Sequence, residues 1–187
     1  MRIKFYVILT VVLLLVASNV EAKTISRQLV KNGGFENDQS YWEGDGDWRE
    51  HDDGVIFKAK KGKWYASLWP DENDSIGITQ TVKIPKKATS ATLVYWYQFS
   101  STDYESVSDD FCTASVNKPN DWWNDYYYQS WDAGSDEPLG WEKVAVELPV
   151  EKMRGKKVEI EFYCSNDYAY NSWLDIDNVK LKVKVKK

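Results

Sequence analysis

Two carboxylates near opposite ends of the chain have the types and surroundings of metal ligands. Glu36 follows Gly33-Gly34, where a sharp turn can present a backbone carbonyl, and Asp177 lies where the apolar alternation changes phase. A β-bulge near Asp177 and Asn178 would explain that change and turn the Asp177 carboxylate out of the regular strand. Calcium binds carboxylate and carbonyl oxygens. Glu36, Asp177 and the backbone at Gly34 could therefore bind calcium, or the acids could simply cap turns or pair with lysines.

A second group of residues has the composition of a sugar-binding surface. The chain contains 10 Trp and 12 Tyr, more than the core of one such domain needs, and residues 120–131 are the densest aromatic segment. Rigid rings stack on sugar faces at little entropic cost, while Asn, Gln and Asp hydrogen-bond to hydroxyls. The same aromatics could instead form a small core that holds a long loop. The candidate contacts are Trp122, Trp123, Tyr126, Tyr128 and Trp131, joined by Trp96 and Gln98 from another strand.

Strands must position these residues, because almost everything after residue 25 reads as strand or turn. Alternation of apolar and polar residues predicts strands at 92–99, 142–148, 157–164 and 180–185, with shorter ones at 26–30, 55–58, 64–68, 76–84, 110–116 and 126–130. Residues 149–154 could form one helical turn. Many short strands separated by Gly, Pro, Asn and Asp predict an all-β, antiparallel β-sandwich or barrel in a single domain.

The first 22 residues have the pattern of a secretory signal peptide. Arg2 and Lys4 precede an apolar run from Phe5 to Ala17, and small residues allow cleavage before Lys23. The run is shorter than the roughly 20 residues of a membrane span, and no later segment is long or apolar enough. We therefore predict a secreted, extracellular domain at residues 23–187 and no membrane span.

The charge of the exported chain is acidic. Removing two basic residues and one acidic residue with the signal changes the formal charge from −5 to −6. An acidic surface with both signs interspersed argues against nucleic acid as a partner and suits neutral ligands or cations. Lysines alternate with apolar residues at 180–187, which indicates either a basic patch for an acidic polymer or a final strand with one face in water. We favour the strand, whose lysines would also discourage edge-to-edge pairing.

The two cysteines, Cys112 and Cys164, are candidates for a disulfide in an exported chain. Along their strands, Cys164 shares a face with Val158 and Phe162, and Cys112 shares one with Val116. Both side chains are therefore expected to point inward, as a core disulfide requires. Two buried free thiols would give the same pattern.

Three motifs carry a resemblance to a known family. Residues 32–36 (Asn-Gly-Gly-Phe-Glu), 78–85 (Ile-Thr-Gln-Thr-Val-Lys-Ile-Pro) and 174–181 (Leu-Asp-Ile-Asp-Asn-Val-Lys-Leu) resemble the galactose-binding-like jelly rolls. The likeness is greatest to carbohydrate-binding modules of the xylanase- and glucan-binding type, and more distant to MAM-like adhesion domains. It spans residues 27–183. The resemblance implies a jelly-roll sandwich and a structural calcium between the opening glutamate and the closing aspartate, here Glu36 and Asp177. The family often closes with two aspartates, where this chain has Asp177 and Asn178.

Catalytic chemistry finds little support in the sequence. His51 is the one histidine, and the chain has no nucleophile elbow and no glycine-rich phosphate loop. Carboxylates are many, but no spacing singles out a glycosidase pair. We predict a secreted, non-catalytic module that binds a polysaccharide or glycan through exposed aromatics and carries structural calcium. The alternative is an adhesion domain with a protein partner, and a glycoside-processing enzyme is the least favoured.

Overall fold

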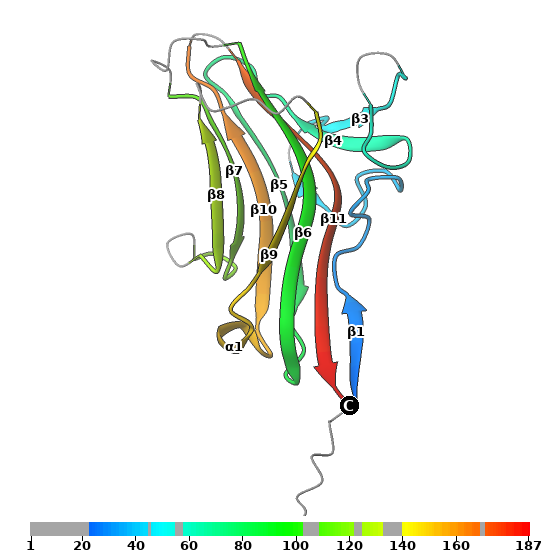
Figure 1. Cartoon of the computed structure of the whole chain (residues 1–187). Coiled ribbons are helices and arrows are strands. Elements are labelled where there is room, and N and C mark those ends of the chain that lie inside the picture. Colours follow the sequence, from blue (N-terminus) through cyan, green and yellow to red (C-terminus); the bar gives the residue numbers. More distant parts are fainter. Residues whose placement is uncertain are drawn as a thin grey trace, which may run out of the picture.

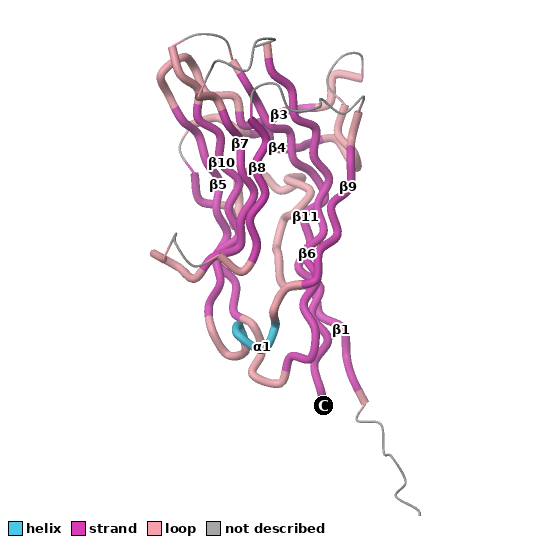
Figure 2. Tube along the Cα trace, turned by 60° about the vertical axis from the view of Figure 1, so that its left-hand side comes forward, coloured by secondary structure: helices cyan, strands magenta, loops and turns pink. Residues whose placement is uncertain are grey.

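Two antiparallel sheets pack face to face in the computed structural model, with α1 (Val150–Met153) at their lower end (Figures 1 and 2). The structure describes residues 23–44, 46–54, 58–102, 109–121, 125–132, 140–168 and 171–187. The first sheet has the order β3 (Arg49–His51), β4 (Trp64–Leu68), β11 (Ser172–Lys186), β6 (Ala88–Ser101) and β9 (Glu142–Glu147), and β1 (Thr24–Gln28) pairs with β11. The second sheet has the order β2 (Glu43–Gly44), β5 (Ser75–Lys83), β10 (Lys157–Ser165), β7 (Phe111–Asn117) and β8 (Tyr127–Asp132). The predicted antiparallel sandwich is confirmed.

The core lies between the inner faces of the two sheets. Alternate residues of each strand point inward, because successive side chains of a β-strand lie on opposite faces. In β10 the inward residues are Val158, Ile160, Phe162 and Cys164, all fully buried. They pack with inward residues of β6 such as Tyr95, whose ring meets Phe162 edge-on at 5.2 Å. The outer faces of both sheets are thereby left with the polar residues and the remaining aromatics.

β11 joins the two ends of the domain. It pairs with β6 along one side and with β4 and β1 along the other, so the first and last strands lie together. Its pairing with β6 shifts register between Asp177 and Lys180, which confirms the bulge predicted there. Its lysines do give the strand one wet face, but β11 is not an edge strand. The expectation that they protect a free edge is therefore wrong.

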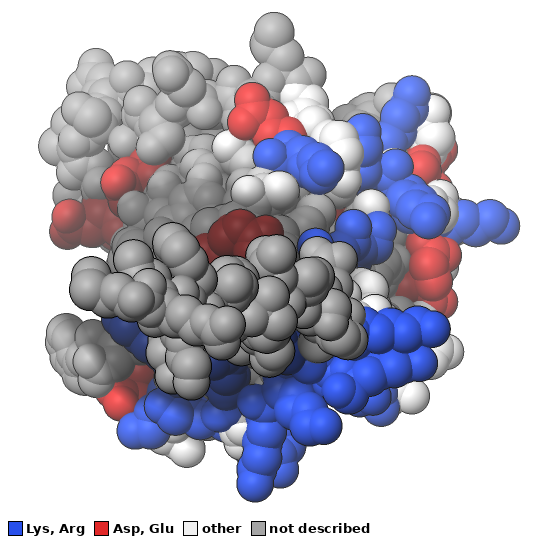
Figure 3. Space-filling view, turned by 60° about the horizontal axis from the view of Figure 1, so that its bottom comes forward, with Lys and Arg blue, Asp and Glu red and all other residues white. Residues whose placement is uncertain are grey.

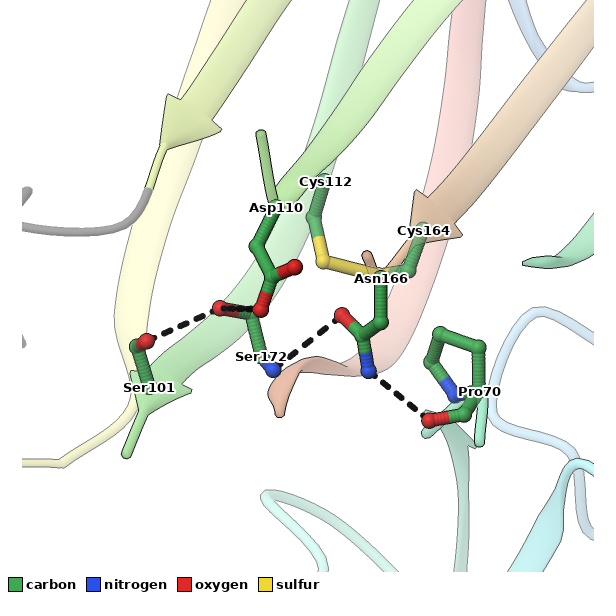
Figure 4. Close-up of a disulfide and its surroundings, with 7 residues drawn as sticks. All are labelled: Pro70, Ser101, Asp110, Cys112, Cys164, Asn166 and Ser172. Atoms are coloured by element: carbon green, nitrogen blue, oxygen red, sulfur yellow. Dashed lines mark hydrogen bonds between the residues drawn. A yellow bond between two sulfur atoms is a disulfide. The ribbon is translucent and has the colours of Figure 1, made fainter. Parts of the chain in front are cut away.

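The disulfide between Cys112 and Cys164 is present, as predicted. The two residues lie directly opposite each other in the pairing of β7 with β10, and both are fully buried (Figure 4). The bond therefore ties neighbouring strands of the second sheet from its inner face.

Buried polar side chains beside the disulfide connect the two sheets (Figure 4). Ser172 Oγ, at the start of β11, lies 2.9 Å from Ser101 Oγ and 3.3 Å from Asp110 Oδ2. Asn166 accepts the backbone N–H of Ser172 at 3.1 Å and donates to the carbonyl of Pro70 at 2.8 Å. This network closes one end of the core with polar groups that are satisfied by one another.

Most strand predictions match the structure to within a few residues, and residues 149–154 do contain one helical turn, α1. The sequence did not indicate the short strands β2 and β3. The predicted strand at 55–58 falls largely outside the described residues, as does the predicted signal peptide at 1–22. No helix in the described ranges is long and apolar enough to cross a membrane.

Candidate functional site

The outer face of the second sheet carries a hollow of about 340 Å³ across β8, β7 and β10. Its walls are outward side chains of those strands and the side chain of Asp125, two residues before β8. They are Phe111, Thr113, Ser115, Asn117, Asp125, Tyr128, Glu161 and Tyr163. Three aromatic rings thus share one open surface with hydroxyls, an amide and two carboxylates.

The aromatic rings of this hollow differ in how they are held. Tyr128 is 57% exposed and projects from β8. Phe111 and Tyr163 face each other across β7 and β10, with ring centroids 6.0 Å apart and planes inclined by 41°. Tyr163 lies opposite Gly77 of β5, where a Cβ would come within 3.1 Å of its ring. The absence of a side chain at Gly77 therefore leaves room for the Tyr163 ring against the sheet.

The polar residues of the hollow form a connected row. The Asn117 amide oxygen accepts from Ser115 Oγ at 3.0 Å, and its nitrogen donates to Asp125 Oδ1 at 2.5 Å. Ser115 Oγ lies 3.4 Å from Glu161 Oε2. Neither lysine nor arginine is among the described residues that line the hollow. The row therefore presents acceptors and a negative charge to a ligand.

Both carboxylates of the row hold protons more tightly than free ones. Burial raises the pKa of Glu161, the neighbouring Glu159 and Asp125 raise it further, and the hydrogen bond with Ser115 lowers it. Burial also raises the pKa of Asp125. The negative charges of Glu161, Glu159 and Asp125 repel one another. A cationic or hydroxyl-rich ligand would relieve this repulsion between carboxylates, whereas an anionic ligand would increase it.

Inward residues of β8 fix the orientation of Tyr128. The Tyr127 hydroxyl lies 2.8 Å from that of Tyr95, which donates to Gln129 at 3.0 Å. Trp131 is 5% exposed and packs against Tyr97 with ring centroids 4.6 Å apart. Because Tyr127, Gln129 and Trp131 face inward, Tyr128 must face outward.

The structure separates the aromatic residues that the sequence grouped together. Of the segment 120–131, Tyr128 lies in the hollow, Tyr126 is partly buried against the core, and Trp131 lies in the core itself. Trp122 and Trp123 lie outside the described residues.

Trp96 and Gln98 lie on the opposite side of the sandwich. Both point outward from β6, which belongs to the first sheet, and the Lys60 ammonium covers the Trp96 ring at 3.8 Å. The expectation that they share one surface with the aromatic segment is wrong, because the two sheets face away from each other. Trp96 and Gln98 lie in β6 of the first sheet, and Tyr128 lies in β8 of the second sheet.

Sequence reasoning missed several exposed aromatics. Phe111 and Tyr163 occupy outward positions of strands that were predicted, so alternation alone could have marked them. Trp69 and Trp173 stack at 4.7 Å with planes 14° apart on the first sheet, and Trp69 is 48% exposed. No sequence signal pointed to this pair.

The proposed metal ligands Glu36 and Asp177 do come together. Asp177 Oδ1 would lie 3.7 Å from a Cβ at Gly34, and Glu36 Cγ lies at 4.0 Å from the same point. The loop before β4 lies against both: Asp177 Oδ2 accepts from the Lys61 N–H at 2.7 Å, and Glu36 Oε1 accepts from the N–H groups of Lys63 and Trp64. The two ends of the chain and this loop therefore meet at one acidic junction.

The junction provides some, but not all, of the ligands that a bound cation would need. Burial raises the pKa of Asp177 to about 7, the N–H groups of Lys61 and Asn178 lower it, and the Glu36 carboxylate raises it. Two carboxylates next to each other are the oxygen donors that calcium prefers. Among the described residues no third acidic, histidine or cysteine side chain joins them, so backbone carbonyls would have to complete the ligand set.

Comparisons with solved structures match nearly the whole chain. A family 61 carbohydrate-binding module in complex with β-1,4-galactotriose superposes with a TM-score of 0.54 at 19% identity, over 86% of this chain and 99% of that one. A family 28 carbohydrate-binding module specific for non-crystalline cellulose gives 0.50 at 12% identity, over 81% and 93%. The chain has the jelly-roll fold of carbohydrate-binding modules.

The same fold occurs in an enzyme. A Stig cyclase from Fischerella sp. TAU superposes with a TM-score of 0.56 at 13% identity, over 87% of this chain and all of that one. No protein-family model and no curated protein sequence matches the chain. At these identities the likeness establishes the fold, and the ligand has to be argued from the side chains.

Proposed function

We propose that the protein is a secreted, non-catalytic carbohydrate-binding module that holds a glycan on the outer face of its second sheet. The observation that carries the proposal is the hollow in which Tyr128, Phe111 and Tyr163 stand beside a connected row of polar side chains. Exposed rings of this kind stack on the C–H faces of sugars, and the row supplies hydrogen-bond partners for hydroxyls. The carbohydrate-binding modules among the structural neighbours support the same class of ligand.

The charge of the hollow narrows the ligand. Asp125 and Glu161 line it without a basic side chain among the lining residues described. A sugar chain bearing carboxylates or sulfates would meet two like charges and would lose affinity. We therefore expect a neutral or amino-substituted glycan.

A binding role accounts for the carboxylates better than hydrolysis does. Each lies beside a polar neighbour of the same row: Asp125 accepts from the Asn117 amide, and Glu161 lies 3.4 Å from the Ser115 hydroxyl. A glycosidase instead needs two carboxyl groups on either side of the scissile bond. Incubation with the bound glycan should release no new reducing ends, and a steady release would contradict the non-catalytic role.

Affinity electrophoresis against a panel of neutral polysaccharides tests the proposal. Tyr128→Ala should abolish most of the retardation, with a loss of about 1–3 kcal/mol of binding free energy, since it removes an exposed stacking ring. Trp69→Ala is the matched control, because it removes a comparably exposed aromatic next to β4 of the first sheet. No retardation on any glycan would overturn the proposed function. Retardation lost in Trp69→Ala and kept in Tyr128→Ala would move the site to the first sheet.

A calcium ion at the Glu36–Asp177 junction is part of the proposal. Its support is the convergence of the two carboxylates at Gly34 and at the bulge of β11. The ion would neutralise the repulsion between the acids and tie the opening segment to β11. Because the junction is remote from the residues of the hollow, its effect is expected on stability.

A further inference from the structure

One end of the sandwich collects basic side chains from four parts of the chain (Figure 3). Residues 83–90, 150–157 and 184–187, together with Lys23, form this basic end. They contain eleven lysines and arginines and one acidic residue, Glu151, a formal charge of +10. All eleven basic side chains are exposed.

Backbone hydrogen bonds hold these segments together. The turn after β5 bonds to the segment before β10, through Ile84 N–H to Lys156 carbonyl at 2.9 Å and Gly155 N–H to Ile84 carbonyl at 3.0 Å. The end of β11 bonds to the same turn and to the start of the domain, through Lys186 N–H to Lys87 carbonyl at 3.1 Å and Lys187 N–H to Lys23 carbonyl at 3.0 Å. The positive charge is therefore fixed in place by the fold.

The charges of the molecule are segregated. Residues 23–187 carry a formal charge of −6, so the rest of the domain outside the basic end carries −16. The sequence-based expectation of interspersed signs is wrong, because the fold brings separate lysine-rich segments to one end. Within the described residues, Arg154 is the one basic side chain of this end that forms an ion pair, at 3.5 Å from Glu151. Such an end has a strong positive potential although the protein as a whole is acidic.

The basic end also contains a hollow that could receive an acidic group of a ligand. A hollow of about 370 Å³ is lined by Lys86, Lys87, Arg154, Lys186 and Lys187, with Ala88 and Thr89. Arg154 is held there by its Nε–H bond to the Ala88 carbonyl at 2.6 Å. Four lysines thus line the same hollow as an anchored guanidinium, so an acidic group of a ligand placed there would meet several positive charges.

We propose that the basic end is a second binding surface, for an anionic polysaccharide, made of residues that do not line the hollow of the second sheet. A polymer with an acidic group on successive units can place one group in the hollow among Lys86, Lys186 and Arg154. Its neighbouring groups then meet the other lysines, such as Lys184, whose side chain lies two residues from Lys186 along β11, about 7 Å. The two surfaces share no lining residue and prefer ligands of different charge, so either can bind its ligand without the other.

Other polyanions fit the observations less well. None of the large exposed apolar side chains in the described residues belongs to the basic end, so it lacks anchors for insertion into a membrane. Base-specific nucleic-acid recognition relies on arginine forks, and the single arginine here already spends its Nε–H on the backbone. The predicted export would also direct the chain away from nucleic acid and from the anionic cytoplasmic leaflet.

Calorimetric titration of the protein in solution with polygalacturonate tests the proposal, with neutral dextran as the reference polymer. Polygalacturonate should bind at about 50 mM salt and lose about tenfold or more in affinity by about 200 mM, because counterions are released on binding. The triple variant Lys86→Gln, Lys87→Gln, Lys186→Gln should weaken binding about tenfold or more, since it removes three of the positive charges that attract the polyanion. Any binding of dextran would belong to the hollow of the second sheet and should be the same in the natural protein and in the triple variant.

A charge-matched variant distinguishes a local surface from net charge. Lys58→Gln, Lys63→Gln, Lys143→Gln removes three exposed lysines elsewhere and should change the affinity by less than about twofold. Equal losses in the two triple variants would overturn the proposal, as would an absence of binding to polygalacturonate. Tighter binding to a DNA duplex, or to vesicles containing phosphatidylserine, would overturn the choice of polysaccharide.

Discussion

Glu161 is a half-buried carboxylate whose protonation should alter the stability of the fold. Because its pKa is raised on folding, it contributes stability that is complete below the pKa of the unfolded chain and is lost as the pH rises through the folded pKa. Glu161→Gln keeps the shape and removes this dependence. The difference in unfolding free energy between the variant and the natural protein should shift in favour of the variant as the pH rises from 4 to 7. Urea unfolding at the two pH values measures this shift. A difference that is constant with pH would contradict the raised pKa.

Asn166 offers a second test at the level of one residue. Its amide joins the Ser172 N–H to the Pro70 carbonyl in the buried network beside the disulfide. Asn166→Ala should cost about 2–3 kcal/mol of unfolding free energy, since it leaves two buried backbone groups without a partner. Asn37→Ala, at an exposed asparagine, should cost less than about 0.5 kcal/mol. Equal costs would contradict the role of the network.

The separate residues of the hollow show how far a sequence can lead. Alternation along predicted strands marks Phe111, Tyr128 and Tyr163 as outward-facing, and Tyr128 was among the predicted contacts. Their assembly into one surface depends on β8, β7 and β10 being neighbours, which is a property of strand order. Trp96 shows the converse, because a suitable residue type on a correctly predicted strand lies on the wrong sheet. The sequence therefore indicated the chemistry of individual side chains but not which of them lie side by side.

The disulfide between β7 and β10 should matter most for the second sheet. Its two cysteines are 52 residues apart, and closing a loop of that length removes entropy from the unfolded chain worth about 4 kcal/mol. The double variant Cys112→Ala, Cys164→Ala should lose stability of that order in denaturant unfolding. The natural protein under reducing conditions is the companion measurement, and it should match the variant to within about 1 kcal/mol.

The junction of the opening segment, β11 and the loop before β4 predicts a response to calcium. If calcium binds Glu36 and Asp177, millimolar calcium should raise the melting temperature and a chelator should lower it. Glu36→Gln retains the oxygen that accepts from Lys63 and Trp64, and removes the charge, so it should shrink the calcium response without unfolding the loop. A melting temperature that is insensitive to calcium in the natural protein would contradict the ion.

Elements were the most predictable part of this protein. The alternation in β6, β9, β10 and β11 and the turn residues between them were sufficient to predict the strands, and the phase change at Asp177 located the bulge. The strands β2 and β3 are only two and three residues long, so their pairing with β5 and β4 leaves no periodic signal in the sequence. Strands this short are defined by the strands with which they pair and not by a pattern of their own.

Positive and negative charges are separated across the whole molecule, and this separation was the property least predictable from the sequence. Net charge and composition gave the correct total but not its distribution, because the lysines of the basic end are separated by up to 164 positions in the chain. Only the meeting of the turn after β5, the segment around α1 and the two terminal strands brings them together. The separation of signs predicts weak self-association at low ionic strength that disappears by about 0.15 M salt, where the screening length is about 8 Å. Light scattering across a salt series would detect it, and association that persists at high salt would contradict an electrostatic cause.

The hydrogen bond between Lys187 and Lys23 has a practical consequence for any immobilised format. Both ends of residues 23–187 emerge side by side, so a tag attached at either end would hold the domain on a chip in the same orientation. That orientation presses the lysine-rich end against the support and leaves the hollow of the second sheet open at the side. Surface-based assays would therefore report the aromatic hollow faithfully and hide the other surface, whichever end carries the tag.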